Sequence, residues 1–289
     1  MSKILQSMLG FLYKIVGPDW VFFILMGPVG QTLIKIFIRL SKDPICFRSK
    51  YGFAMEVSPY EYWMSGYMFL GETNPQETAV IVSVLRVGDT MIDAGAHAGW
   101  YSLVASQCVG SEGSVLSFEP NPVCADVLNR NIKMNGFDNI QIIQDALSNK
   151  SGTSRLWVGD DMGGSLIKDQ AQHITKNKVK SITVKTLRLD DFLKKQKTIK
   201  NIRCIKVDVE GAEVEVLLGA KKILLQHKPI ILAEVYCKDQ KQLRRRDKLF
   251  VYLKSLGYEP FLFTRDGLRI TEYTHISHDT INIVLKPHV

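Results

Sequence analysis

The stretch Thr90-Met-Ile-Asp-Ala-Gly-Ala-His-Ala-Gly99 decides the fold, because it reads as a buried strand that runs directly into a glycine-rich turn. The apolar run from Trp100 to Ala105 then begins a helix. In an open α/β sheet, such a strand–turn–helix unit places its turn at the carboxyl end of the strand, where ligands bind. The stretch therefore predicts an α/β protein whose ligand site includes Gly95 and Gly99.

Strand-like and helix-like stretches alternate beyond residue 75, which predicts a Rossmann-like, mainly parallel seven-stranded sheet covered by helices. Strands are expected at 90–94, 114–119, 140–144, 203–209, 229–236, 258–263 and 280–285. Helices are expected at 76–86, 100–108, 122–135, 186–195, 212–226 and 239–256, and a hairpin of 153–158 with 179–185 follows the third strand. The link between the last two strands is too short for a crossover helix, so the last strand should be antiparallel.

Composition limits the classes of protein and partner that fit this chain. The 289 residues are 46% apolar, enough for one large domain with an appendage. The net charge is +8, but the basic residues are spread out without interleaved aromatic residues, so no nucleic-acid partner is expected. Five cysteines without a CxxC pattern argue against disulfides and zinc, and they indicate a reducing, cytoplasmic compartment.

The first 44 residues form a hydrophobic and amphipathic segment, expected to be helical, ahead of a catalytic domain at 45–289. The uncharged run 20–34 is shorter than the roughly 20 residues of a spanning helix. A signal peptide is not expected either, because the first alanine is Ala54. The apolar face of 4–16 should pack on the catalytic domain or on a second subunit in a homodimer, or lie in a membrane interface, giving peripheral membrane contact through 1–40.

Charge placement around the turn favours S-adenosylmethionine over a dinucleotide. The Gly-x-x-x-Gly spacing is not the dinucleotide fingerprint, and Asp93 would repel a pyrophosphate but attract the ammonium of a methionine moiety. Glu119, after the second strand, can accept hydrogen bonds from both ribose hydroxyls. Asp145 can accept from the adenine amine, with the small Ala146 beside it leaving room for the ring. The remaining cofactor contacts are expected at His97, Pro120 and Asn121, although Asn121 should also cap the helix at Pro122 and the glycines could serve strand–helix packing.

The fourth strand carries the candidate chemistry. Lys206, Asp208 and Glu210 alternate with apolar residues, so the three charges should point to one face, and Glu234 ends the next strand. Charges in a central strand are costly unless they are paired or functional, whereas an edge strand could simply solvate them. Methyl transfer requires removal of a hydroxyl proton, for which Asp208 is the first choice and Glu210 the second, with Lys206 holding the carboxylates. No metal is expected, although the same carboxylates could bind a divalent cation instead.

With these residues identified, the chain from about Gly71 to Tyr236 resembles the FkbM-type methyltransferase family. The resemblance is carried by Gly88–Ala96, Phe118–Pro122, Asn131–Gly136, Lys206–Glu213 and Leu217–Ala220. It implies a class I methyltransferase fold and O-methylation of a hydroxyl on a sugar, glycolipid or secondary metabolite. It also implies cofactor contacts at Asp93, Gly95, Gly99, Glu119 and Asp145, and catalysis at Asp208 and Glu210. The chain departs from the family at His97, where Asn is usual, and at Ala94, where Ile or Val is usual.

Two other functions fit the same pattern less well. A non-catalytic membrane or assembly module could keep the fold, but it would not need Asp93, Glu119 and Asp208 together. A nicotinamide oxidoreductase is disfavoured by the glycine spacing. The sequence thus predicts an S-adenosylmethionine-dependent O-methyltransferase whose acceptor pocket includes the loop Met162–Ser165.

Overall fold

The computed structural model describes residues 45–57, 73–159, 163–169, 171, 179–196, 199, 201–236, 239–264, 267–270 and 280–287. The expected amphipathic segment 1–44 lies outside these residues, as does Met162 of the expected acceptor loop. Among the helices that are described, none combines the length and the apolar character needed to cross a membrane.

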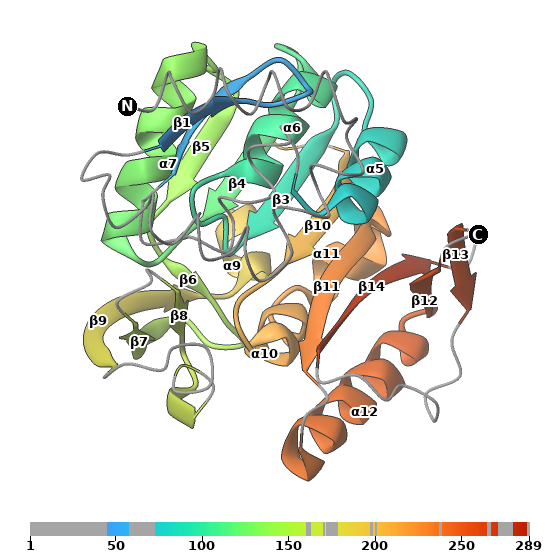
Figure 1. Ribbon diagram of the computed structural model, residues 1–289. Coiled ribbons are helices and arrows are strands. Elements are labelled where there is room, and N and C mark those ends of the chain that lie inside the picture. Colours follow the sequence, from blue (N-terminus) through green and yellow to red (C-terminus); the bar gives the residue numbers. More distant parts are fainter. Residues whose placement is uncertain are drawn as a thin grey trace, which may run out of the picture.

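A large mixed sheet forms the centre of the protein, with the strand order β13-β12-β14-β11-β10-β3-β4-β5 (Figure 1). Its strands are β3 (Thr90–Ala94), β4 (Ser114–Phe118), β5 (Ile140–Ile143), β10 (Ile202–Val207), β11 (Ile230–Tyr236), β12 (Tyr258–Thr264), β13 (Gly267–Ile270) and β14 (Thr280–Pro287). The five strands from β5 to β11 are parallel, whereas β14 is antiparallel to both β11 and β12. All seven expected strands are present with the expected antiparallel last strand, and β13 extends the sheet by an eighth.

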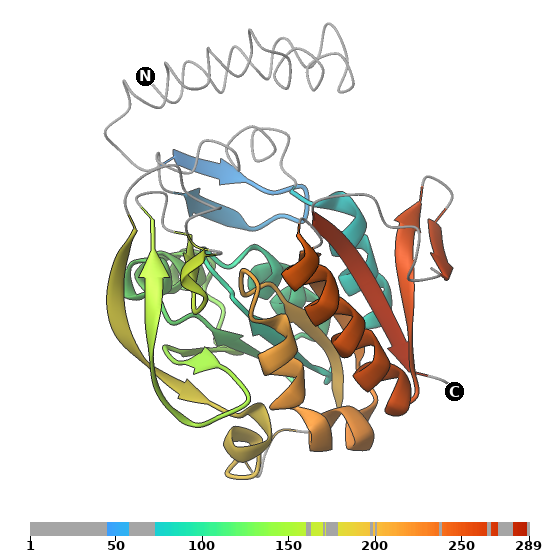
Figure 2. The ribbon, with the colours of Figure 1, turned by 90° about the horizontal axis from the view of Figure 1, so that it is seen from below.

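Helices cover both faces of this sheet (Figure 2). One face packs against α5 (Pro75–Val84), α6 (Trp100–Val109) and α7 (Pro122–Asn135). The other packs against α9 (Leu189–Leu193), α10 (Glu213–Leu218), α11 (Lys221–His227) and α12 (Gln240–Ser255). Because successive side chains of a strand point to opposite faces, Met91 joins the first core and Ile92 the second. Asn121 caps α7 through the backbone N–H of Val123, as expected.

Two smaller sheets lie outside the central one. The insert consists of β6 (Ala146–Leu147), β7 (Gly152–Val158), β8 (Gly164–Ser165) and β9 (Lys180–Leu187), in the order β6-β9-β7-β8. It contains the expected hairpin as β7 and β9, which are antiparallel. The hairpin of β1 (Ile45–Arg48) and β2 (Ala54–Val57) was not expected from the sequence and packs against α7.

Two expected helices are shorter or divided. The expected helix 186–195 begins only at Leu189, because β9 continues to Leu187. The expected helix 212–226 is two helices, α10 and α11, that meet at Gly219. A Cβ atom at Gly219 would lie 2.2 Å from the carbonyl oxygen of Ser148, so the insert packs directly on this junction.

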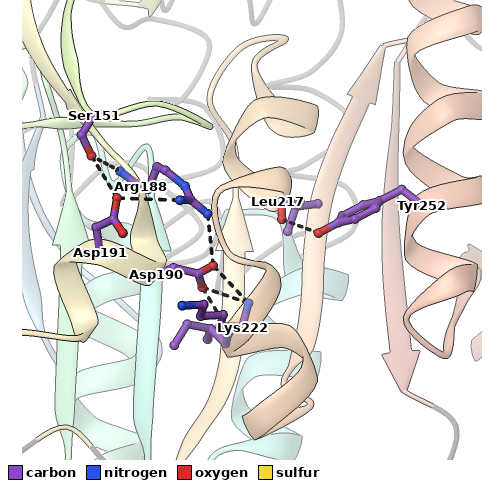
Figure 3. Close-up of polar contacts among 8 residues, drawn as sticks. Ser151, Arg188, Asp190, Asp191, Leu217, Lys222 and Tyr252 are labelled. Carbon is purple, nitrogen blue, oxygen red and sulfur yellow. Dashed lines mark hydrogen bonds and ion pairs between the residues drawn. The ribbon is translucent and has the colours of Figure 1, made fainter.

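The start of α11 is fixed by a buried carboxylate from α9 (Figure 3). Both carboxylate oxygens of Asp190 accept the backbone N–H of Lys222 at 3.1 Å, and one accepts that of Ile223 at 3.2 Å. Arg188 pairs with Asp190 at 3.5 Å. Carboxylates are favourable at helix N-termini, so Asp190 ties α9 to α11 and holds the turn between α10 and α11 in place.

Candidate active site

The turn after β3 is seated on the loop that follows β10. The backbone N–H groups of Gly95 and Ala96 donate to the carbonyl of Phe118 at 2.9 and 3.1 Å. Gly95 has a φ of +83°, and a Cβ atom there would lie 1.9 Å from the carbonyl oxygen of Asp208. Only glycine fits at this position. The close approach brings the expected cofactor turn into contact with the loop after β10, which holds the expected catalytic residues Asp208 and Glu210.

The second glycine of the turn serves helix packing. Gly99 has a φ of +98°, and a Cβ atom there would lie 2.3 Å from Cδ1 of Leu128 in α7. Gly95 and Gly99 are therefore both required by the close packing of protein segments. Packing was the alternative to a ligand-binding role that the sequence left open. This packing sets the shape of the turn that a cofactor would meet.

Asp93 lies behind this turn and is 0% exposed. Its Oδ2 accepts a hydrogen bond of 2.5 Å from Ser102 Oγ, while Oδ1 has no hydrogen-bond partner among the described residues. Burial is the main reason why the pKa of Asp93 is raised to about 6. A buried carboxylate with an unused acceptor atom fits a cationic ligand, as the ammonium of a methionine moiety would be.

Glu119 connects the ends of β3 and β4. Its Oε2 accepts the backbone N–H of His97, and its Oε1 accepts the backbone N–H of Asn121, both at 2.8 Å. His97 has a φ of +52°, an uncommon conformation for a residue with a side chain, and the bond to Glu119 helps to hold it. The structure thus brings Glu119, His97 and Asn121 together, with the half-buried Pro120 between them.

Asp145 and Ala146 follow the next parallel strand, β5. The ends of β3, β4 and β5 are neighbours in the sheet, so all three expected cofactor-binding ends lie at one edge. Asp145 is half-buried, but Ala146 begins β6 and packs against Leu156 and Val184 in the core of the insert. The small side chain of Ala146 is therefore explained by packing as well as by space for an adenine ring.

The acidic residues after β10 converge through a turn. The strand ends at Val207, two residues earlier than expected, and Glu210 adopts a left-handed conformation with a φ of +56°. One carboxylate oxygen from each of Asp208, Glu210 and Glu234 lies within 4.8 Å of the others. Because β10 lies between β3 and β11, a solvated edge strand does not explain its charges.

Lys206 forms an ion pair with one carboxylate of this cluster, Asp208. Its side chain is 1% exposed, and its Nζ lies 3.1 Å from Oδ2 of Asp208, whose side chain is 31% exposed. Burial opposes both charges, but their mutual attraction raises the pKa of Lys206 and lowers that of Asp208. Burial and the charge of Asp208 raise the pKa of Glu210 to about 7 and also raise that of Glu234. Asp208 is therefore the member of the cluster that is most readily ionised.

Tyr236 and Glu213 complete the site and were not singled out as functional from the sequence. The Tyr236 hydroxyl donates to Glu210 Oε2 and lies 3.3 Å from Glu234 Oε2. Glu213 accepts the backbone N–H of Gly211 at 2.8 Å and so closes the loop, and burial raises its pKa to about 8. The signal for Tyr236 was its position two residues after Glu234, which puts both on one face of β11.

The insert reaches the same loop. Ser165 is buried in β8, and its hydroxyl donates to the carbonyl of Glu210 at 2.6 Å. A cavity lined in part by Tyr236 and Glu213 adjoins this loop. Its walls come from the residues after β8, the start of α10, the end of β11 and the first turns of α12, and include Ile167, Val214, Tyr236, Lys241 and Arg245. Part of the expected acceptor loop thus directly contacts the loop that carries Asp208 and Glu210.

The described geometry can be compared with known proteins. The family described as Methyltransferase FkbM domain matches residues 93–260. "Methyltransferase sdnD" of Sordaria araneosa is 31% identical over 154 residues, which cover 45% of this chain and 59% of that protein. "Methyltransferase 1" of Beauveria bassiana is 29% identical over 143 residues, covering 45% of this chain and 57% of that protein. The chain thus spans less than two thirds of the length of these curated relatives.

Solved structures with similarity to this chain are more distant. "Methyltransferase FkbM" from Methylobacillus flagellatus is 16% identical, with 93% of this chain and 61% of that chain covered and a TM-score of 0.42. A "SAM-dependent O-methyltransferase" from Thermotoga maritima is 15% identical, with 85% and 77% covered and a TM-score of 0.43.

Proposed function

From the premise that this chain belongs to the FkbM methyltransferase family, a family of S-adenosylmethionine-dependent enzymes, we propose that it is an O-methyltransferase acting on a hydroxyl of a sugar, glycolipid or secondary metabolite. The observation that carries the proposal is the contact between Gly95 and Asp208. It joins a turn suited to a cationic cofactor to a carboxylate suited to accept a proton. A non-catalytic module would not require these two features to be in contact.

Residues at the ends of β3, β4 and β5 would hold the cofactor. Asp93 supplies negative charge behind the turn, which favours the ammonium and sulfonium groups of S-adenosylmethionine. Glu119 shapes the turn through His97 and can accept ribose hydroxyls with lone pairs that its two backbone bonds leave. Asp145 follows β5, at the sheet edge where β3 and β4 also end, and its carboxylate could accept a hydrogen bond from the adenine amine.

The carboxylate cluster would carry the proton chemistry. When bound, S-adenosylmethionine would supply an electrophilic methyl group for transfer to the acceptor oxygen. Asp208 would then take the proton that the acceptor hydroxyl loses. An oxygen that is gaining a methyl group becomes strongly acidic, so a carboxylate of low pKa suffices as the base. Lys206 holds Asp208 in its ionised form, which is the form that the reaction needs.

The acceptor class is supported by the groups around the cluster. Asp208, Glu210, Glu234 and Tyr236 can form hydrogen bonds to several hydroxyls at once. The adjoining cavity combines apolar walls with both acidic and basic side chains, a lining that suits a hydroxyl-rich molecule with an apolar face. A divalent cation is the second candidate ligand of the carboxylates, but the ammonium of Lys206 already supplies positive charge at Asp208.

The setting of the enzyme is a further proposal. We place it in the cytoplasm, with peripheral membrane contact through residues 1–40 or a homodimer contact covering the same apolar face. Flotation with anionic liposomes should recover the full chain better than a chain lacking residues 1–44. Equal recovery of the two would contradict the membrane contact, and sedimentation of both would then test the homodimer.

Isothermal titration with S-adenosylhomocysteine tests the proposed cofactor. Binding is expected, whereas NAD should bind much more weakly because the turn lacks the dinucleotide fingerprint. A sample that unfolds cooperatively but does not bind S-adenosylhomocysteine would overturn the proposal. Transfer of a labelled methyl group from S-adenosylmethionine to a panel of hydroxylated sugars and lipids would then identify the acceptor.

A further inference from the structure

The ammonium of Lys206 is surrounded by more acidic groups than one positive charge can neutralise. Asp208 is its hydrogen-bond partner at 3.1 Å, and Asp93, Glu77, Glu210 and Glu234 interact with it electrostatically from β3, α5, the loop after β10 and β11. A lysine side chain is long and flexible, so attraction alone does not select one carboxylate. Something must hold the ammonium at Asp208.

Tyr101, in the first turn of α6, is placed to do this. The Lys206 Nζ lies 5.1 Å from the centre of the Tyr101 ring, a distance at which a cation is attracted to the face of an aromatic ring. The far end of the ring is fixed, because its hydroxyl accepts a 2.9 Å hydrogen bond from Nδ2 of Asn74. Burial also raises the pKa of the phenol, so the ring remains neutral. The ammonium is thus held between a carboxylate and an anchored ring.

We propose that Tyr101 is a positioning residue for methyl transfer, whose ring holds the Lys206 ammonium against Asp208. The acidic groups that compete for the ammonium are Glu77, Asp93, Glu210 and Glu234, and Cys204 is a neutral neighbour on the same strand. With the ring in place, the ammonium stays beside Asp208, so Asp208 stays ionised. The negative charge of Asp208 in turn favours the protonated forms of Glu210 and Glu234. The assignment of Asp208 as the base rests on the proposed function, but the contact between ring and ammonium does not.

The contact can be measured directly on the full chain. Lys206 is buried, so its ammonium protons should exchange slowly enough to give a proton–nitrogen NMR signal, assigned by its loss in Lys206→Arg. Tyr101→Phe loses the bond to Asn74 but keeps the aromatic ring, so it should change the exchange rate of the ammonium protons much less than loss of the ring does. Tyr101→Leu removes the ring and should increase the exchange rate of the ammonium protons by about fivefold, which corresponds to an attraction of ~1 kcal/mol.

A graded series guards against a variant that fails to fold. Fluorinated phenylalanines with one, two or three ring fluorines at position 101 keep the shape of the ring but progressively weaken its attraction for a cation. The exchange rate of the Lys206 ammonium should rise with each fluorine. Equal rates across the series, or a Tyr101→Leu protein that folds and keeps the wild-type rate, would overturn the inference.

Cofactor binding in the same samples separates the two proposals. If wild-type protein binds S-adenosylhomocysteine and the exchange rates do not respond to the ring, the role of Tyr101 is wrong and the proposed function stands. If the rates respond and the cofactor does not bind, the contact is real and the proposed function fails. The pH below which methyl transfer slows should differ from wild type in Tyr101→Leu but not in Tyr101→Phe. That result would connect the contact to catalysis.

Discussion

The side-chain amide of Asn131 hydrogen-bonds the backbone of Glu56 through both of its ends, as a neighbouring strand would. Its Oδ1 accepts the Glu56 N–H at 2.7 Å, and its Nδ2 donates to the Glu56 carbonyl at 2.9 Å. Asn135, one turn later in α7, makes the same pair of bonds to Ala54, at 2.8 and 2.6 Å. Four helical residues rise about 6 Å and two strand residues about 6.6 Å, so the two amides match the repeat of β2.

Asn131 has one further contact that Asn135 lacks. Its Nδ2 also donates to the carbonyl of Ala98, in the turn after β3, at 2.8 Å. We expect Asn131→Ala to lower the free energy of unfolding by about 3 kcal/mol, because two partly buried backbone groups of Glu56 and the buried carbonyl of Ala98 lose a partner. It should also weaken binding of S-adenosylhomocysteine about tenfold, as the turn loses a support.

Asn135→Ala is the matched control for this prediction. It removes the same type of contact to β2, together with a bond from its Nδ2 to the carbonyl of Asn131, and should also cost about 3 kcal/mol of stability while leaving the cofactor affinity unchanged. Urea denaturation and isothermal titration measure the two effects. Equal loss of affinity in both variants would contradict the special role of Asn131.

The contact between Gly95 and Asp208 can be tested against a glycine with the same backbone conformation. Gly95 and Gly88 have φ values of +83° and +86°, but a Cβ atom at Gly88 would meet nothing within 4 Å. Gly88→Ala should therefore cost only about 1 kcal/mol, the strain of a positive φ. Gly95→Ala should cost more than ~3 kcal/mol, because a backbone carbonyl must move. Similar midpoints of thermal unfolding for the two variants would show that the loop at Asp208 can move to make room for the methyl group without a loss of stability.

Much of the architecture follows from local patterns in the sequence. Apolar runs bounded by turns located all seven expected strands, and Asn121 with Gly136 marked both ends of α7, where Gly136 has a φ of +66°. The acidic residues were placed at one sheet edge because parallel strands end together there. These features depend on a few neighbouring residues, so they can be read from the chain directly.

The features that escaped prediction depend on contacts between distant residues. The α10–α11 division requires the Ser148 carbonyl beside Gly219. The β1–β2 hairpin has strands of only four residues and is held by amides of α7, some 80 residues away. The left-handed turn at Glu210 brings that side chain to Tyr236, a meeting that strand alternation alone does not give. The cofactor role of the expected residues remains a prediction.

Glu119→Ala should weaken S-adenosylhomocysteine binding by about tenfold to a hundredfold, because two backbone N–H groups that shape the turn lose a charged acceptor. The loss should appear in the affinity rather than in the stoichiometry of an isothermal titration. Glu112→Ala removes an exposed carboxylate from the loop before β4 and should leave the affinity unchanged. Wild-type affinity in Glu119→Ala would show that the turn keeps its form without this residue.

The pH dependence of methyl transfer separates Asp208 from Glu210 as the base. The pKa of Asp208 is lowered by Lys206, so Asp208 remains ionised as the pH falls, and the rate should be flat between about pH 6 and about pH 8. The pKa of Glu210 is raised to about 7, so a rate that falls as the pH drops through 7 would identify Glu210 instead. Asp208→Asn should abolish turnover but keep the affinity for S-adenosylhomocysteine, since the contact with Gly95 is made by its backbone carbonyl.

The buried carboxylate of Asp93 should make the stability of the protein fall as the pH rises. Its pKa is about 6 in the folded protein, against an ordinary value near 3.8, so the folded state binds the proton more tightly. The stabilisation is complete below the unfolded pKa and is lost as the pH rises through 6, by about 3 kcal/mol in total. The isosteric Asp93→Asn should remove this dependence while keeping an acceptor for Ser102.

Urea denaturation of both proteins between about pH 4 and about pH 8 isolates this effect, because the other titrating groups cancel in the difference. S-adenosylhomocysteine should restore part of the lost stability, since its ammonium favours the ionised carboxylate. Its affinity for the wild type should therefore increase as the pH rises through 6, whereas its affinity for Asp93→Asn should not. Parallel stability curves for the two proteins would show that the carboxylate is not desolvated, and an affinity without pH dependence would place the ammonium away from Asp93.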